Sequence, residues 1–97
     1  MVILRSYVMV ARDGYEDGLR DALVSLAGRV CALAGCEGAA IYRDVQNSQQ
    51  FSFLERWTSL EDYKAGGARI GKDAFTDVIT ALSAPPVTST LEELYSN

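Results

Sequence analysis

The stretch that decides the fold is Gln50–Gly66, which reads QFSFLERWTSLEDYKAG. In its first half, every second residue carries an aromatic ring or a carboxylate. These residues are Phe51, Phe53, Glu55 and Trp57. Because successive side chains of a β-strand point to opposite faces, the spacing predicts a strand over Gln50–Trp57 with these four side chains on one face. A carboxylate and an indole on one inward face suit a small-molecule pocket, and they also suit an ordinary core.

A helix is expected directly after this strand. Ser59 is a typical N-cap because its hydroxyl can accept a hydrogen bond from a free backbone N–H, and Asp62 stands three residues later. Gly66–Gly67 is expected to interrupt the helix after about two turns. A second helical piece should then run to Pro85–Pro86, which cannot continue a helix. Tyr63 would lie on the first, short piece, beside the strand.

The rest of the chain supplies one further helix and three further strands. The first strand is expected over Val2–Ala11, and Asp13 should cap the helix that Gly35 ends. Strands over Gly38–Val45 and Val87–Tyr95 complete the set. The order strand, helix, strand, strand, helix, strand is the ferredoxin-like β-α-β-β-α-β unit. We therefore predict an α+β domain with a four-stranded antiparallel sheet and both helices on one face.

The other face of this sheet needs a cover, because the strands carry apolar residues on both sides. The residues expected on that uncovered face are Ile3, Tyr7, Met9, Leu54 and either Ile41 or Tyr42. A second copy of the same sheet is the most economical cover. The chain is thus expected to form a homodimer.

Composition narrows the classes of function. The chain has 97 residues, 48% of them apolar, which predicts a single domain over residues 1–97. A net charge of -4 and the lack of any basic run argue against nucleic acid as a partner. The opening residues alternate around Arg5 and contain no long apolar run, so we expect a cytoplasmic protein without a membrane span.

The lack of histidine and the spacing of the two cysteines bear on which cofactors the chain could hold. The chain has no histidine, which removes the commonest metal ligand and the usual general base at neutral pH. Its two cysteines, Cys31 and Cys36, are too close in sequence for a disulfide of good geometry. We expect both to be reduced thiols, and we expect no metal and no other cofactor.

Two segments resemble the antibiotic biosynthesis monooxygenase (ABM) family, which belongs to the dimeric α/β-barrel superfamily. They are AGCEGAAIYRD at Ala34–Asp44 and FLERWTSLEDYKA at Phe53–Ala65, and the resemblance extends over about Tyr7–Leu94. It implies a homodimer whose sheets pack face to face, with a cavity in each subunit between the sheet and its helices. It also implies that molecular oxygen reacts there with a phenolic or quinol-like aromatic, without flavin, haem or metal.

The resemblance assigns residues one by one. Glu55 and Trp57 fall on the family's Glu-x-Trp, and Tyr63 falls where some oxygenating members place a tyrosine. The chain departs from the family at two positions. Gly66 stands about where many members carry a histidine, and Phe53 stands where oxygenating members place an asparagine. The first departure weakens any mechanism that depends on histidine. Together the two leave the family's best-known catalytic sets incomplete in this chain.

The resulting hypothesis is a cofactor-independent monooxygenase that acts on a small aromatic molecule. The predicted catalytic residues are Glu55, Trp57 and Tyr63, and the predicted pocket residues are Phe53, Phe75, Tyr7 and Tyr42. Two plainer interpretations stay open: Trp57 as a core residue, and Glu55 in a salt bridge with Arg5 or Arg43. A non-catalytic module, either stress-associated or binding a small hydrophobic molecule, is the alternative function.

Overall fold

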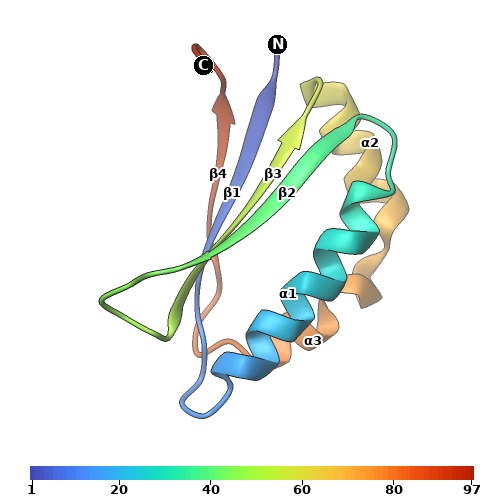
Figure 1. Ribbon diagram of the computed structural model, residues 1–97. Coiled ribbons are helices and arrows are strands. Elements are labelled where there is room, and N and C mark those ends of the chain that lie inside the picture. The colour runs from blue at the N-terminus through green and yellow to red at the C-terminus, as the bar shows by residue number, and fades with distance from the viewer.

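The computed structural model describes residues 1–97 and has the predicted order of strands and helices (Figure 1). The elements are β1 (Ile3–Val10), α1 (Glu16–Cys31), β2 (Cys36–Arg43), β3 (Gln50–Trp57), α2 (Leu60–Ile70), the 3₁₀ helix η1 (Lys72–Phe75), α3 (Thr76–Thr80) and β4 (Val87–Glu92). The four strands form one antiparallel sheet in the order β2-β3-β1-β4. This is the ferredoxin-like α+β fold that the sequence predicts.

The helices all lie on one side of the sheet, as Figure 1 shows. In α1 the buried side chains recur at intervals of three and four residues, which places them on the stripe that faces the sheet. They are Leu19, Leu23, Leu26 and Val30. Burial of each such side chain stabilises the fold by about 1.5–3 kcal/mol. None of the helices combines the length and the apolar composition that a membrane crossing needs.

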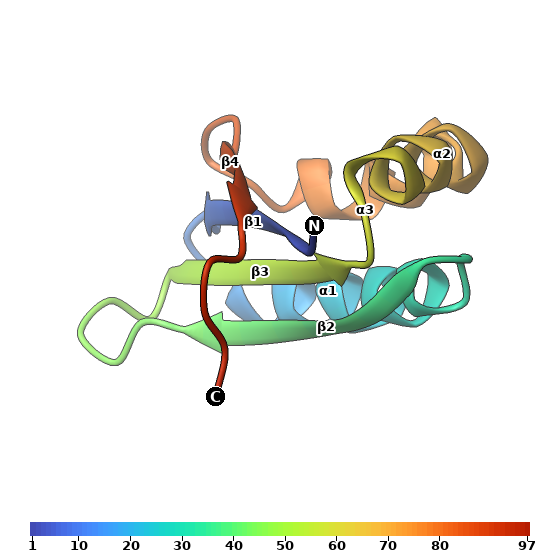
Figure 2. The same ribbon diagram turned by 90° about the horizontal axis from the view of Figure 1, so that it is seen from above.

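Strand β3 lies inside the sheet between β1 and β2, while β2 and β4 form the two edges (Figure 2). Its residues alternate strictly between buried and half-buried, and the buried set is Phe51, Phe53, Glu55 and Trp57. The prediction that these four side chains share one inward face is confirmed. Because β3 pairs on both sides, this face also fixes which residues of β1 and β2 point toward the helices.

The prediction was wrong about which face of β1 is uncovered. Tyr7 and Met9 stand directly opposite Phe53 and Phe51, so they face the helices. Ile3 is opposite Trp57 and is buried with them. Both sets of alternate residues in β1 are apolar, and the pattern of the strand alone cannot say which set faces inward. The register also identifies the residues on the open face, the side of the sheet away from the helices. They are Leu4, Ser6, Val8, Ala40, Tyr42, Leu54, Val87 and Leu91.

The helix boundaries also differ from the prediction. Helix α2 runs through Gly66–Gly67 without a break and ends at Gly71, whose φ of 82° is accessible mainly to glycine. Glycine inside a helix costs about 1 kcal/mol relative to alanine, which weakens α2 without ending it. Asp13 does not cap α1, because that helix begins two residues later than predicted, at Glu16 after the N-cap Tyr15.

Candidate functional site

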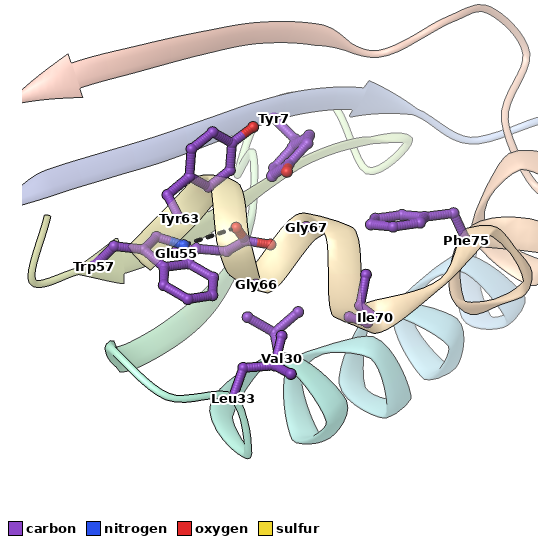
Figure 3. Close-up of a pocket in the computed structure, with 10 residues that line it drawn as sticks. All are labelled: Tyr7, Val30, Leu33, Glu55, Trp57, Tyr63, Gly66, Gly67, Ile70 and Phe75. Carbon is purple, nitrogen blue, oxygen red and sulfur yellow. Dashed lines mark hydrogen bonds between the residues drawn. The ribbon is translucent and has the colours of Figure 1, made fainter. Parts of the chain in front are cut away.

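A cavity of about 120 Å³ lies between the sheet and the helices (Figure 3). Its walls come from β1, β3, α1, α2 and η1. The residues that line it are Tyr7, Val30, Leu33, Glu55, Trp57, Tyr63, Gly66, Gly67, Ile70 and Phe75. Figure 3 shows the two tyrosines and the carboxylate on one side, and the aliphatic side chains of α1 and α2 on the other. The cavity therefore combines an apolar wall with a polar one.

Glu55 is the buried carboxylate of this site, and only 3% of its surface is exposed. One of its oxygens, Oε1, accepts a hydrogen bond of 3.1 Å from Nε1 of Trp57. Burial raises the pKa of Glu55 because it disfavours the charged form, whereas the indole N–H and the Arg5 guanidinium lower it. The predicted salt bridge does not form, since neither Arg5 nor Arg43 has a carboxylate within 4.0 Å.

Trp57 is held against helix α2 by the absence of a side chain at Gly66. A Cβ built at Gly66 would lie 2.5 Å from Cη2 and 2.8 Å from Cζ3 of the indole. Such approaches are far closer than carbon atoms tolerate. Only glycine at this position leaves room for the edge of the indole where it lies.

Tyr63 is positioned by the start of α2. Ser59 caps that helix, as predicted: its hydroxyl accepts a hydrogen bond of 3.1 Å from the backbone N–H of Asp62. The Tyr63 ring stands edge-on to Trp57, with 6.0 Å between ring centroids and 66° between planes. Aromatic pairs favour this arrangement.

Tyr7 supplies the second phenol of the cavity. Its ring centroid lies 5.7 Å from that of Phe53. Burial first, and then the nearby Glu55 carboxylate, raise the pKa of Tyr7 to about 12 against an opposing effect of Arg5. Tyr7 is therefore a neutral phenol at physiological pH, able to donate a hydrogen bond but not to act as a base.

The structure brings five of the seven predicted site residues together. Those that line the cavity are Glu55, Trp57, Tyr63, Tyr7 and Phe75. Phe53 is fully buried in the core and does not reach the cavity. The placement of Tyr42 was wrong: it lies on the opposite face of the sheet and is 58% exposed. Its neighbour Ile41 faces the helices instead, because Ile41 is the residue opposite Phe53.

Five lining residues were not predicted as part of the site. They are Val30, Leu33, Gly66, Gly67 and Ile70. Val30 belongs to the apolar stripe of α1, and Leu33 continues its three-residue spacing just past the end of that helix. The sequence therefore carried a signal that they face the sheet, though not that they end beside a cavity. Ile70 reaches the site only because α2 continues past the two glycines. No group of three or more histidine, cysteine, aspartate or glutamate side chains is close enough to hold a metal ion.

Residues 1–65, which are 65 of the 97 in the chain, match the family described as antibiotic biosynthesis monooxygenase. The match ends inside α2, so Gly66, Gly67, Ile70 and Phe75 of the cavity lie beyond it. No curated protein matches the chain.

Solved structures share the fold at low sequence identity. A Mycobacterium tuberculosis protein is 18% identical, with a TM-score of 0.85 over 99% of this chain and 98% of that chain. A mutant of SnoaB, a cofactor-independent oxygenase from Streptomyces nogalater, is 9% identical, with a TM-score of 0.88 over 98% and 95%. A Methanosarcina mazei protein is 14% identical, with a TM-score of 0.87 over 96% and 93%. By its sequence match over residues 1–65 and by its fold, the chain belongs to the antibiotic biosynthesis monooxygenase family.

Proposed function

We propose that the protein is a cofactor-independent monooxygenase that oxygenates a small phenol or quinol in the cavity between sheet and helices. The observation that carries the proposal is the buried carboxylate of Glu55, which lines an otherwise largely apolar cavity beside Trp57 and two tyrosines. A carboxylate whose pKa is raised by burial is a stronger base than an exposed one, and it can accept a phenolic proton. The family membership supports the same reaction class.

The size of the cavity limits the substrate. Its volume is about 120 Å³. A dry protein cavity of about 150 Å³ holds one benzene molecule, whereas pockets for larger ligands measure about 300–1,000 Å³. The cavity is therefore too small for more than one aromatic ring, which would lie against the indole of Trp57.

The proposed reaction divides its work among three side chains. Trp57 orients the ring, Glu55 accepts the phenolic proton, and Tyr63 donates a hydrogen bond to a substrate oxygen. The electron-rich phenolate then reduces molecular oxygen, the co-substrate. One oxygen atom bonds to a ring carbon, and the other leaves as water with the two hydrogen atoms that the phenol loses. The product is a quinone, so that phenol and O₂ yield quinone and H₂O.

Oxygen uptake tests this proposal. Wild-type protein with single-ring hydroquinones and catechols should consume oxygen faster than the substrates do alone. Glu55→Gln should lose about 10²–10⁴-fold in rate, which is the usual contribution of a positioned base. Tyr42→Phe, on the far face of the sheet, is the matched control and should leave the rate unchanged. Uptake at the background rate, or full activity in Glu55→Gln, would rule the proposal out.

We also propose that a second copy of the chain covers the open face of the sheet. Apolar side chains on that face are markedly exposed: Tyr42 by 58%, Leu91 by 46% and Val87 by 68%. Light scattering should give twice the monomer mass. Leu54→Glu, at the centre of this face, should give a monomer, while Val45→Glu, in a loop and 100% exposed, should not. A wild-type monomer at micromolar concentration would refute the dimer.

The alternative function is binding without catalysis. The mainly apolar wall formed by Val30, Leu33 and Ile70 favours it, because such a wall retains a small hydrophobic molecule without any chemistry. Phenol or toluene would then raise the melting temperature and be recovered unchanged. Detection of an oxidised product would exclude this alternative.

A further inference from the structure

Arg5 lies beside the polar wall of the cavity, although it does not line the cavity itself. It is the residue of β1 directly opposite Glu55 in β3, and it shares the same face of the sheet. Its Cζ atom lies 5.0 Å from the ring centroid of Tyr7 and 5.4 Å from that of Tyr63. Both rings line the cavity. The guanidinium is thus held against the two tyrosines that separate it from the space for a ligand.

The guanidinium of Arg5 forms no salt bridge within the chain. No carboxylate lies within 4.0 Å of it, and its one side-chain hydrogen bond is donated by Nη1 to Oγ1 of Thr90 at 2.7 Å. Its Nε atom is buried and has no hydrogen-bond acceptor at all. A buried donor without an acceptor costs about 1–3 kcal/mol. Such an arrangement is typical of a site that a ligand completes.

The titratable groups that face Arg5 are two phenols and one carboxyl. Tyr7 from β1 and Tyr63 from α2 contribute the phenols. Glu55 from β3, directly opposite Arg5, contributes the carboxyl: burial raises its pKa and the guanidinium lowers it. From β4 Arg5 meets the uncharged Thr90. Once Glu55 has accepted a proton, no negative charge of the chain balances Arg5, so this side of the cavity then favours an anion.

We propose that Arg5 holds the bound substrate as its phenolate anion, by placing a positive charge behind Tyr7 and Tyr63, on the side of the cavity where the phenol loses its proton. This inference rests on the proposed function, and it names the form of the substrate that the site selects. When Glu55 accepts the proton it becomes neutral, and the new negative charge on the phenol faces the guanidinium. An opposite charge within about 4–6 Å lowers the pKa of an acid by roughly 1–3, and for a charge behind two tyrosine rings we expect the lower end of that range, about 1.

The probe that tests this inference is 4-nitrophenol, a single-ring phenol whose anion absorbs visible light. Its absorbance is titrated against pH with saturating protein and without protein, under nitrogen. We expect the midpoint of the bound probe to lie below that of the free probe. Arg5→Met should raise the bound midpoint by about one pH unit or more, and Arg5→Lys should restore most of the difference. Because no oxygen is present, the readout does not depend on oxygenation.

Arg43→Met is the matched control. Arg43 also lies over an aromatic ring, 4.9 Å from the centroid of Phe51, and it does not line the cavity. This variant should leave the bound midpoint where the wild type has it. A bound midpoint at or above that of the free probe would overturn the inference without recourse to any variant. So would an unchanged midpoint in folded Arg5→Met, or failure of the probe to bind. The oxygen-uptake assay tests the proposed monooxygenase function separately, because the titration of the probe is carried out without oxygen.

Discussion

The indole of Trp57 occupies the space in which a side chain at Gly66 would begin. The 2.5 Å between a built Cβ and Cη2 leaves no room for any residue larger than glycine while the indole keeps its place. The family resemblance predicts a histidine near this position. In this chain, a tryptophan hydrogen-bonded to Glu55 excludes it. The indole that donates a hydrogen bond to Glu55 is thus the same group that requires glycine at position 66.

The first prediction concerns Gly66→Ala. Alanine normally stabilises a helix interior by about 1 kcal/mol over glycine, but here the new methyl group overlaps the indole. Overpacking of this kind costs about 1–3 kcal/mol, so the net change should be destabilising. Urea unfolding measures it. Gly67→Ala, with no atom within 4 Å of the built Cβ, is the control and should be neutral or stabilising. Equal stability of the two variants would contradict the packing described.

The second prediction is a pH dependence of stability that Glu55 causes. Burial raises the pKa of Glu55 above its value in the unfolded chain, so the folded state binds the proton more tightly. The resulting stability is fully present below the unfolded pKa and is lost as pH rises through the folded pKa. Between pH 4.5 and 8, the free energy of unfolding of the wild type should therefore fall relative to that of Glu55→Gln. A constant difference between the two proteins would show that Glu55 titrates normally.

The third prediction concerns Trp57→Phe. The indole N–H is the hydrogen-bond donor to Glu55, and its bond lowers the pKa of that carboxyl. Its removal should raise the pKa of Glu55 further and destabilise the fold by about 1–3 kcal/mol or more. Carbon-13 NMR of the Glu55 carboxyl follows the titration. Phe51→Leu removes a buried ring from the same strand without touching this bond, and it should leave the titration of Glu55 in place.

The fourth prediction concerns the helix that carries Tyr63. Ser59→Ala removes the hydroxyl that accepts the backbone N–H of Asp62, which should destabilise the protein by about 1 kcal/mol. Thermal unfolding measures this change. Ser48→Ala, at an exposed loop position, should stay within about 0.5 kcal/mol of the wild type. A cap variant as stable as the loop variant would mean that packing alone holds the start of α2.

Local pattern predicted much of this fold, because each signal acts over a few residues. The alternation in Gln50–Trp57 marked the strand and its inward face. The serine at position 59 marked the helix start. Prediction was less successful where a pattern allowed two answers. Gly66–Gly67 suggested a break because glycine is a poor helix former, but the contact of Gly66 with Trp57 is made across the tertiary structure.

The sequence by itself determined the order of the elements, the family and the segment that carries Glu55, Trp57 and Tyr63. Each of these follows from patterns that extend over a few neighbouring residues of the chain. Only the tertiary structure decided which face of each strand points inward. That choice brought Tyr7 and Arg5 beside Glu55 and placed Tyr42 on the opposite face. The reason is the two-residue period of a strand: where both faces are apolar, only the register with its neighbours distinguishes them.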